Sequence, residues 1–174
     1  MGVGKSTVGR LLADRLGLGY RDTDDDIERT AGRAIPEIFI DNGEPHFRAL
    51  ERTAVSTAVA EHRGVLALGG GAVLDEGTRA LLTGLPVVFL DVGVSEAVKR
   101  VGLNAPRPLL AVNPRQTWRE LMERRRPLYT EVARVVVGTD DRTPEEVAEA
   151  VLDALELRHP AEGTPRTPSQ EKKA

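Results

Sequence analysis

Two hydrophobic patterns alternate along this chain. Apolar residues spaced three and four positions apart predict amphipathic helices, and the longest such stripe lies within residues 44–61. Between these stripes, the runs 64–68 and 86–91 are short, apolar and closed by glycine or aspartate, as buried strands commonly are. Strands that alternate with helices predict an α/β domain built on a parallel sheet.

The same patterns predict the order of the elements. Residues 102–114 hold three prolines and little periodicity, which predicts a loop or lid. From residue 159 the chain is polar and proline-rich, so we expect one domain over residues 1–158 and a disordered tail over 159–174. The predicted elements are helix 5–16, strand 19–24, helix 25–32, helix 44–61, strand 64–68, helix 76–82, strand 86–91, helix 95–101, helix 115–124, strand 134–137 and a last helix opened by the capping box 143–146.

Composition narrows the class of protein. Hydrophobic residues make up 40% of the 174 positions but aromatic residues only 3%, so the core must consist mainly of aliphatic side chains. A net charge of −3 lacks the basic excess of a nucleic-acid binder. The absence of cysteine excludes disulfides, zinc–cysteine sites and thiol catalysis. No uncharged stretch is long enough to span a bilayer. We therefore expect a cytoplasmic monomer without nucleic-acid or membrane partners.

The first residues carry the clearest chemical motif. Gly2, Val3, Gly4, Lys5, Ser6 and Thr7 match the second half of the phosphate-binding loop G-x-x-x-x-G-K-[ST]. In such a loop, glycine N–H groups surround phosphate oxygens, the lysine reaches the β and γ phosphates, and the serine hydroxyl holds Mg²⁺. Two alternatives are a glycine-rich helix start without a ligand and an N-myristoylation signal beginning at Gly2.

The position of this motif is unusual, because Met1 stands inside the loop. A phosphate-binding loop normally follows a strand and begins with an earlier glycine. We therefore expect the full chain to begin roughly ten or more residues upstream of Met1, with that strand and glycine included. The alternative is a truncated nucleotide-binding fragment with little activity.

Two carboxylates follow the first helix. Asp22 and Asp24 lie two residues apart, so on a strand both side chains leave the same face. One could hold Mg²⁺ and the other could accept a hydroxyl proton. The alternative is a solvated acidic turn that caps the next helix.

Arginines and glycines supply further candidates. Arg48 lies on the buried side of its helix, with Glu51 three residues later to orient it. Arg107, between two prolines of the predicted lid, could neutralise phosphate charge. Within the run 124–126, any one guanidinium could bind a substrate carboxylate, or the run could remain solvated at a helix end. The glycines at 69–71 would permit close approach of a ligand.

Together these motifs resemble the shikimate kinase family. The similarity runs from residue 1 to about 157. The resemblance implies a three-layer, doubly wound P-loop kinase fold with a lid, in an enzyme that transfers the γ-phosphoryl group of ATP to the 3-hydroxyl of shikimate with one Mg²⁺ ion. The motifs, in order, are residues 2–7, Asp22-Thr23-Asp24, Phe47-Arg48 with Glu51, residues 68–73, residues 107–110 and residues 125–129.

The resemblance also implies roles for individual residues. Lys5, Asp24 and Arg107 would be catalytic, and Ser6 and Asp22 would hold the metal. The shikimate site would consist of Asp24, Arg48, Gly70 and Arg125. ATP would contact residues 2–7, Arg107 and Arg142, with Arg100 possible beside the base. Rival functions are another small-molecule P-loop kinase or a nucleotide-binding module without catalysis.

Overall fold

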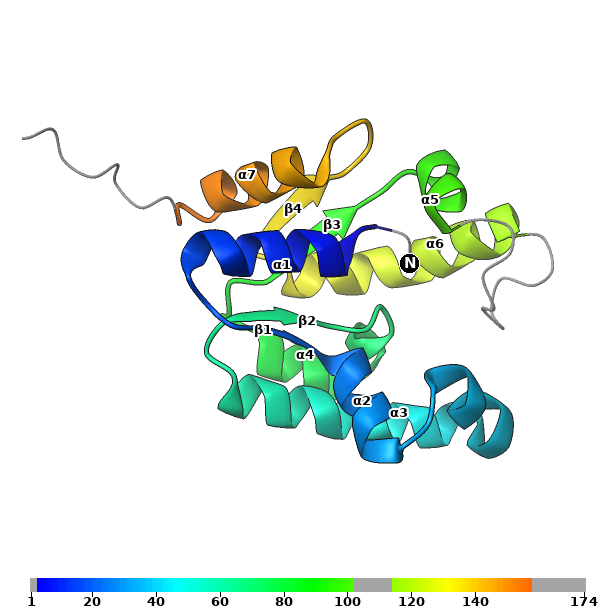
Figure 1. The fold of residues 1–174 in the computed structure, drawn as a ribbon. Helices are drawn as coiled ribbons and strands as arrows, with labels where there is room; N and C mark the ends of the chain where they lie inside the picture. The colour runs from blue at the N-terminus through cyan, green and yellow to red at the C-terminus, as the bar shows by residue number, and fades with distance from the viewer. Residues whose placement is uncertain (1–2, 102–113, 158–174) are drawn as a thin grey trace, which may run out of the picture.

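The computed structural model describes residues 3–101 and 114–157 (Figure 1). Helices and strands alternate along this part of the chain, as predicted. The elements are α1 (Lys5–Leu16), β1 (Tyr20–Asp22), α2 (Thr23–Ala31), α3 (Ile35–Glu61), β2 (Val65–Ala67), the 3₁₀ helix η1 (Ala72–Leu74), α4 (Glu76–Leu82), β3 (Val88–Asp91), α5 (Val94–Val101), α6 (Pro114–Val132), β4 (Val135–Gly138) and α7 (Pro144–Ala154).

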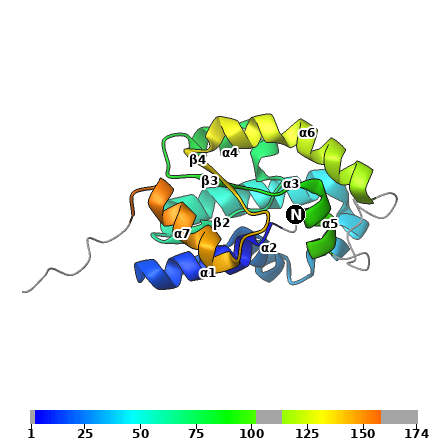
Figure 2. The same cartoon turned by 90° about the horizontal axis from the view of Figure 1, so that it is seen from above.

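Helices cover both faces of the strands. In Figure 2, α1 and α7 lie on one side of the strands and α4 and α6 on the other. Aliphatic side chains fill both interfaces: Val8, Val137 and Val151 form a core between α1, β4 and α7, while Val73, Leu82 and Val132 join η1, α4 and α6. This three-layer α/β arrangement confirms the predicted fold class.

The strands pair in parallel. β1 pairs with β2, with Asp22 opposite Ala67, and β3 pairs with β4, with Asp91 opposite Gly138. Within the described residues these are two separate two-stranded sheets, in contrast to the single sheet expected from the sequence. The carboxyl end of β1 leads into α2 and that of β2 into the glycines at 69–71, so both features lie at the same edge.

Most predicted elements have ends shifted by one or two residues, and three differences bear on the site or the packing. The strand expected over 19–24 ends at Asp22, because the Asp22 side chain accepts a hydrogen bond from Asp24 N and begins α2 at Thr23. Asp24 is therefore helical, and the prediction that it shares a strand face with Asp22 was wrong.

The other two differences concern α3 and α6. α3 spans Ile35–Glu61, but non-helical backbone at Gly43 (φ 79°, a value that suits glycine) divides it. The part after this kink agrees with the predicted helix 44–61, and the helical residues before the kink were not predicted. α6 continues past the expected end at 124 and through Pro127, since the tertiary contacts of Leu128 and Val132 stabilise its last turns.

Two predicted features lie largely outside the described residues. The lid expected over 102–114 is described only at Pro114, where α6 begins, and Arg107 lies outside the description. The tail expected over 159–174 and residues 1–2, including Gly2, also lie outside it. Among the helices that are described, none is long and apolar enough to cross a membrane.

The capping box predicted for α7 is present and can be tested. Thr143 Oγ1 accepts a hydrogen bond from Glu146 N at 3.2 Å, and the Glu146 carboxylate accepts one from Thr143 N at 2.8 Å. We expect Thr143→Ala to lower the free energy of unfolding by about 1 kcal/mol in urea titrations, because a buried helix loses its cap. Thr53→Ala is the control, since its hydroxyl contacts only its own helix. Equal losses in both variants would contradict the capping role.

Candidate active site

The phosphate-loop residues meet the first carboxylate. Gly4 precedes α1 with a φ of 85°, and Lys5 is the first residue of the helix. Lys5 Nζ lies 2.6 Å from Asp22 Oδ2, and Ser6 Oγ donates to the same oxygen at 3.2 Å. Burial acts to raise the pKa of Asp22, but the hydrogen bond and charge of Lys5 outweigh it and hold the pKa below its usual value. Asp22 therefore remains ionised beside the loop.

Tyr20 completes this cluster, and the sequence analysis did not identify it. Its hydroxyl donates to Asp22 Oδ2 at 3.0 Å. A methyl carbon added at Gly9 would lie 2.7 Å from the Tyr20 ring, so the absence of a side chain at Gly9 lets the ring pack on α1. The available signal was the spacing: Tyr20 and Asp22 are two apart on a strand and share a face.

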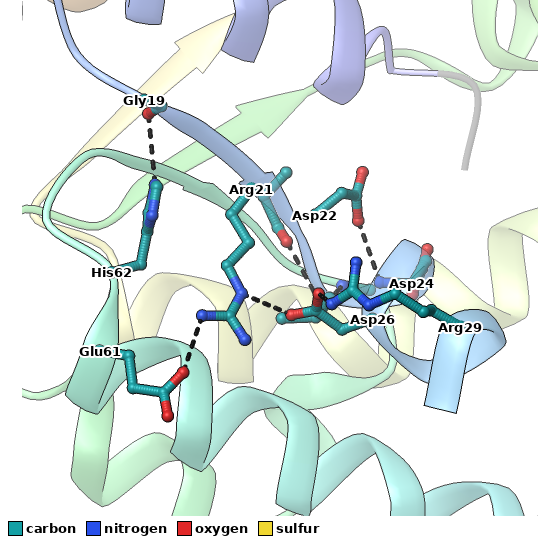
Figure 3. A network of polar contacts seen from close by, with 11 residues as sticks. Gly19, Arg21, Asp22, Asp24, Asp26, Arg29, Glu61 and His62 are labelled. Carbon is teal, nitrogen blue, oxygen red and sulfur yellow. Dashed lines mark hydrogen bonds and ion pairs between the residues drawn. The ribbon is translucent and has the colours of Figure 1, made fainter. Parts of the chain in front are cut away.

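Ion pairs around the buried Asp26 carboxylate fix the start of α2 against β1 and α3. Arg21 Nε donates to Asp26 Oδ2 at 2.6 Å, and Arg21 Nη1 reaches Glu61 at the end of α3 at 3.2 Å (Figure 3). Arg29 also pairs with Asp26. Because Asp26 is buried and lies one turn from the start of α2, this network restrains the backbone that carries Asp24.

The three glycines after β2 give space to functional side chains. A methyl carbon at Gly69 would lie 2.7 Å from Asp24 Oδ1 and 2.9 Å from Glu51 Oε1. One at Gly71 would overlap the guanidinium of Arg48. The sequence favoured close approach of a ligand at this turn. The structure shows close approach of the chain's own charged groups.

Arg48 is held by two carboxylates. Its Nη1 donates to Glu51 Oε2 at 2.6 Å, as the spacing of these residues predicted, and its Nη2 donates to Glu44 Oε1 at 2.9 Å. Glu51 is only 3% exposed. Because its partners fix the guanidinium from one side, Arg48 is oriented toward the glycine turn.

Arg125 reaches the same turn from α6. Its Nη1 donates to the carbonyl oxygen of Gly70 at 3.0 Å, and the Tyr129 hydroxyl donates to that oxygen at 2.5 Å. Arg126 instead forms a bidentate pair with Asp91 at 2.6 and 2.8 Å. The arginine run left open by the sequence is thus divided: Arg125 faces the site and Arg126 anchors the helix.

Two carboxyl groups in this cluster are disfavoured as anions. Burial raises the pKa of Asp24, partly offset by the charge of Lys5, and Asp22 raises it further. Burial also raises the pKa of Glu51, against the opposing effect of Arg48. A carboxylate with a raised pKa, beside cations and an open turn, is suited to accept a proton from a bound hydroxyl.

Comparison with known proteins identifies the family. The family model described as shikimate kinase matches residues 1–156. The chain belongs to the shikimate kinase family. It is 72% identical to a shikimate kinase of Streptomyces avermitilis over 91% of this chain and 92% of the relative, and 70% identical to one of Streptomyces coelicolor over the same shares. The family is one of ATP-dependent kinases, so the chain is an ATP-dependent small-molecule kinase.

A solved structure supports the fold independently. A shikimate kinase from Acinetobacter baumannii, in complex with shikimate, is 38% identical, with a TM-score of 0.83 over 90% of this chain and 89% of that chain. That protein binds shikimate. The likeness extends over nearly the whole three-layer arrangement.

The predicted site residues of this kinase divide into two groups. Lys5, Ser6 and Asp22 gather at the end of β1, and Asp24, Arg48 and Arg125 gather around Gly70. Val3 belongs to the same loop motif, and Thr7 lies in the first turn of α1. Arg142 lies in the turn after β4, where its Nη1 contacts Gly138 O at 3.4 Å. Arg100 lies within α5, and Gly2 and Arg107 are outside the described residues.

The raised pKa of Asp24 makes a stability prediction. The folded chain binds the proton of the Asp24 carboxyl group more tightly than the unfolded chain does. The ionised carboxylate therefore lowers the free energy of unfolding above the folded-state pKa, and this loss disappears below the unfolded-state pKa. We expect Asp24→Asn to raise the urea midpoint at about pH 7 and to lose this advantage toward about pH 4.

Asp25→Asn is the matched control, because Asp25 is exposed on the same first turn of α2. It should show no such pH-dependent gain. If Asp24→Asn destabilises the protein at about pH 7, the carboxylate is better compensated than its burial indicates.

Proposed function

We propose that this kinase transfers the γ-phosphoryl group of ATP to the 3-hydroxyl of shikimate, giving shikimate 3-phosphate and ADP in the route to chorismate and the aromatic amino acids. The observation that carries the proposal is the convergence of Asp24, Arg48 and Arg125 on the glycines at 69–71. A proton acceptor beside two guanidinium groups suits a hydroxylated carboxylic acid. The high identity to shikimate kinases supports this substrate.

The ATP end comprises the start of α1. Residues 2–7 surround the phosphates with backbone N–H groups, and the positive end of the α1 dipole adds to the attraction. Lys5 binds the β and γ phosphates. Lys5 Nζ lies 2.6 Å from Asp22 Oδ2, so phosphates bound at the start of α1 would compete with this carboxylate for the lysine. Arg107 would neutralise charge in transfer, and Arg142 would contact the adenine.

The donors at this end fit one Mg²⁺ ion. Ser6 Oγ and the Asp22 carboxylate are hard oxygen ligands side by side. Among the described residues, no group of three or more acidic or histidine side chains forms a metal cage of protein ligands alone, so phosphates and water would complete the coordination. A bound Mg²⁺ would neutralise negative charge on the transferring phosphoryl group.

The acceptor end is formed by the glycine turn. Arg48 and Arg125 would bind the shikimate carboxylate, because a guanidinium group can donate two parallel hydrogen bonds to one carboxylate. The Gly70 backbone would contact the ring. Asp24 would hydrogen-bond the 3-hydroxyl. In the reaction the hydroxyl oxygen forms a bond to Pγ, the bond from Pγ to the leaving oxygen of ADP breaks, and the hydroxyl proton passes to Asp24.

ATP and shikimate are the two partners in this proposal. A single Mg²⁺ ion, a monomeric state, a cytoplasmic location and the lack of nucleic-acid and membrane partners remain sequence-based predictions within it.

Turnover tests the proposal directly. We expect ADP release to depend on added shikimate and the product to be shikimate 3-phosphate, measured by coupled assay and mass spectrometry. Asp24→Asn should lose at least about two orders of magnitude in kcat, the usual contribution of a positioned base, with ADP affinity unchanged by calorimetry. ADP binding without shikimate-dependent turnover would favour the nucleotide-binding module, and preference for another acceptor would favour a different small-molecule kinase.

The carboxylate clamp is tested with a pair of arginines one turn apart on α3. Arg48→Ala should raise the KM for shikimate by roughly ten- to a hundredfold, the value of a charge-assisted hydrogen bond, with the KM for ATP little changed. Arg52→Ala is the control, since Arg52 is exposed and faces Asp75 at 3.5 Å. An unaltered KM in Arg48→Ala would place the clamp elsewhere.

A further inference from the structure

The Gly70 carbonyl oxygen has two donors, and their arrangement suggests a role for Tyr129. Arg125 Nη1 lies 3.0 Å away and the Tyr129 hydroxyl 2.5 Å away. The proposed function, on which this inference rests, requires Arg125 to turn its donors to the substrate carboxylate. The Gly70 carbonyl is exposed, so without another donor that movement would leave it paired only with water, and no protein group would then fix its position.

We propose that Tyr129 is a positioning residue for substrate binding: its hydroxyl holds the Gly70 carbonyl while Arg125 binds the carboxylate. Tyr129 does not contact the reacting atoms. It keeps the glycine turn in place and spares Arg125 from serving two acceptors at once.

Packing holds the Tyr129 ring in position. The ring stacks on Phe89 of β3, with centroids 4.8 Å apart and an angle of 28° between the planes. It also packs against the core beside Val73 and Val132. A ring fixed by stacking loses little entropy when its hydroxyl forms a hydrogen bond, so the contact with Gly70 is preorganised.

A second contact fixes the helix that carries both donors. Asp91, at the end of the same strand as Phe89, forms the bidentate pair with Arg126, one residue from Arg125. Residues 125 and 129 are one helical turn apart and therefore lie on one face of α6. The contacts of Phe89 and Asp91 thus fix α6 against β3 in a position where both donors reach the Gly70 oxygen.

The neighbouring charges allow Arg125 to leave the Gly70 carbonyl and bind the substrate carboxylate. Glu51, the buried carboxylate that also attracts Arg125, is paired with Arg48 at 2.6 Å. Burial raises the pKa of Tyr129, so its hydroxyl keeps the proton that it donates. Arg125 and Tyr129 both donate to the Gly70 carbonyl, so Tyr129 can keep this contact when Arg125 gives it up.

The decisive variant is Tyr129→Phe, which keeps the ring and the stack and removes only the hydroxyl. We expect the KM for shikimate to rise about five- to tenfold, the usual value of a neutral hydrogen bond, with kcat and the KM for ATP within about twofold of the wild type. Thr130→Val, one residue along α6, removes a hydroxyl that contacts only the Arg126 carbonyl of its own helix. It should leave both KM values unchanged.

A substrate analogue separates positioning from a general loss of structure. The carboxamide of shikimate is uncharged at this group and attracts Arg125 less strongly than the carboxylate does. With this analogue, the KM values of the wild type and Tyr129→Phe should therefore differ by less than about twofold. In an Arg125→Ala background, Tyr129→Phe should likewise add little. The thermal midpoint of each variant is measured alongside.

Three outcomes would overturn the inference. They are an unchanged KM for shikimate in Tyr129→Phe, an equal rise for ATP and shikimate, and a full effect on the carboxamide. In each of these the wild-type chain still phosphorylates shikimate, so the proposed function survives. A wild-type chain without shikimate-dependent turnover overturns the proposed function first, and the role of Tyr129 with it.

Discussion

The lack of side chains at residues 69–71 is the constraint on which the site depends. Asp24 and Glu51 occupy the space beside Gly69, Arg48 that beside Gly71, and Arg125 reaches the Gly70 carbonyl. These groups come from α2 and α3, which are consecutive, and from α6, which is distant from both in the sequence. A β-carbon at either outer position would push a helix or its charged group away from the turn. The three glycines therefore determine how closely the three helices approach the turn, and the helices determine where the charged side chains of the site lie.

Convergence concentrates charge, and the charges are not compensated equally. Glu51 is almost fully buried but has Arg48 at 2.6 Å, and Lys5 compensates Asp22 at the same distance. Asp24 has no cation within hydrogen-bonding distance among the described residues, and burial raises its pKa. Among the described carboxylates of this cluster, Asp24 is thus the one whose buried charge has no close cation, whereas Asp22 and Glu51 are each paired. Such a local cost is common where a group must react.

Local patterns predicted much of the fold. The bounds of α1 and α4 agree with the predicted helices, because helical spacing and glycine or proline punctuation are encoded within each segment. The helical start of α2 was missed because it depends on one contact, from Asp24 N to the Asp22 side chain. The continuation of α6 through Pro127 and the pairing of Arg126 with Asp91 depend on residues distant in sequence. Hydrophobic periodicity carries no information about such contacts.

The hydrogen bond from Asp24 N to the Asp22 side chain, which begins α2, also links the two ends of the site. Asp22 ends β1, accepts from Lys5 and Ser6 through Oδ2, and caps α2 through Oδ1 by the hydrogen bond from Asp24 N. The phosphate loop and the proton acceptor are therefore joined through one side chain and two peptide units. Since Asp26 also fixes α2 to Arg21 of β1, the acceptor end has little freedom to move relative to the phosphate end. For a reaction that depends mainly on holding two substrates in line, a short and rigid connection between their sites is the economical arrangement.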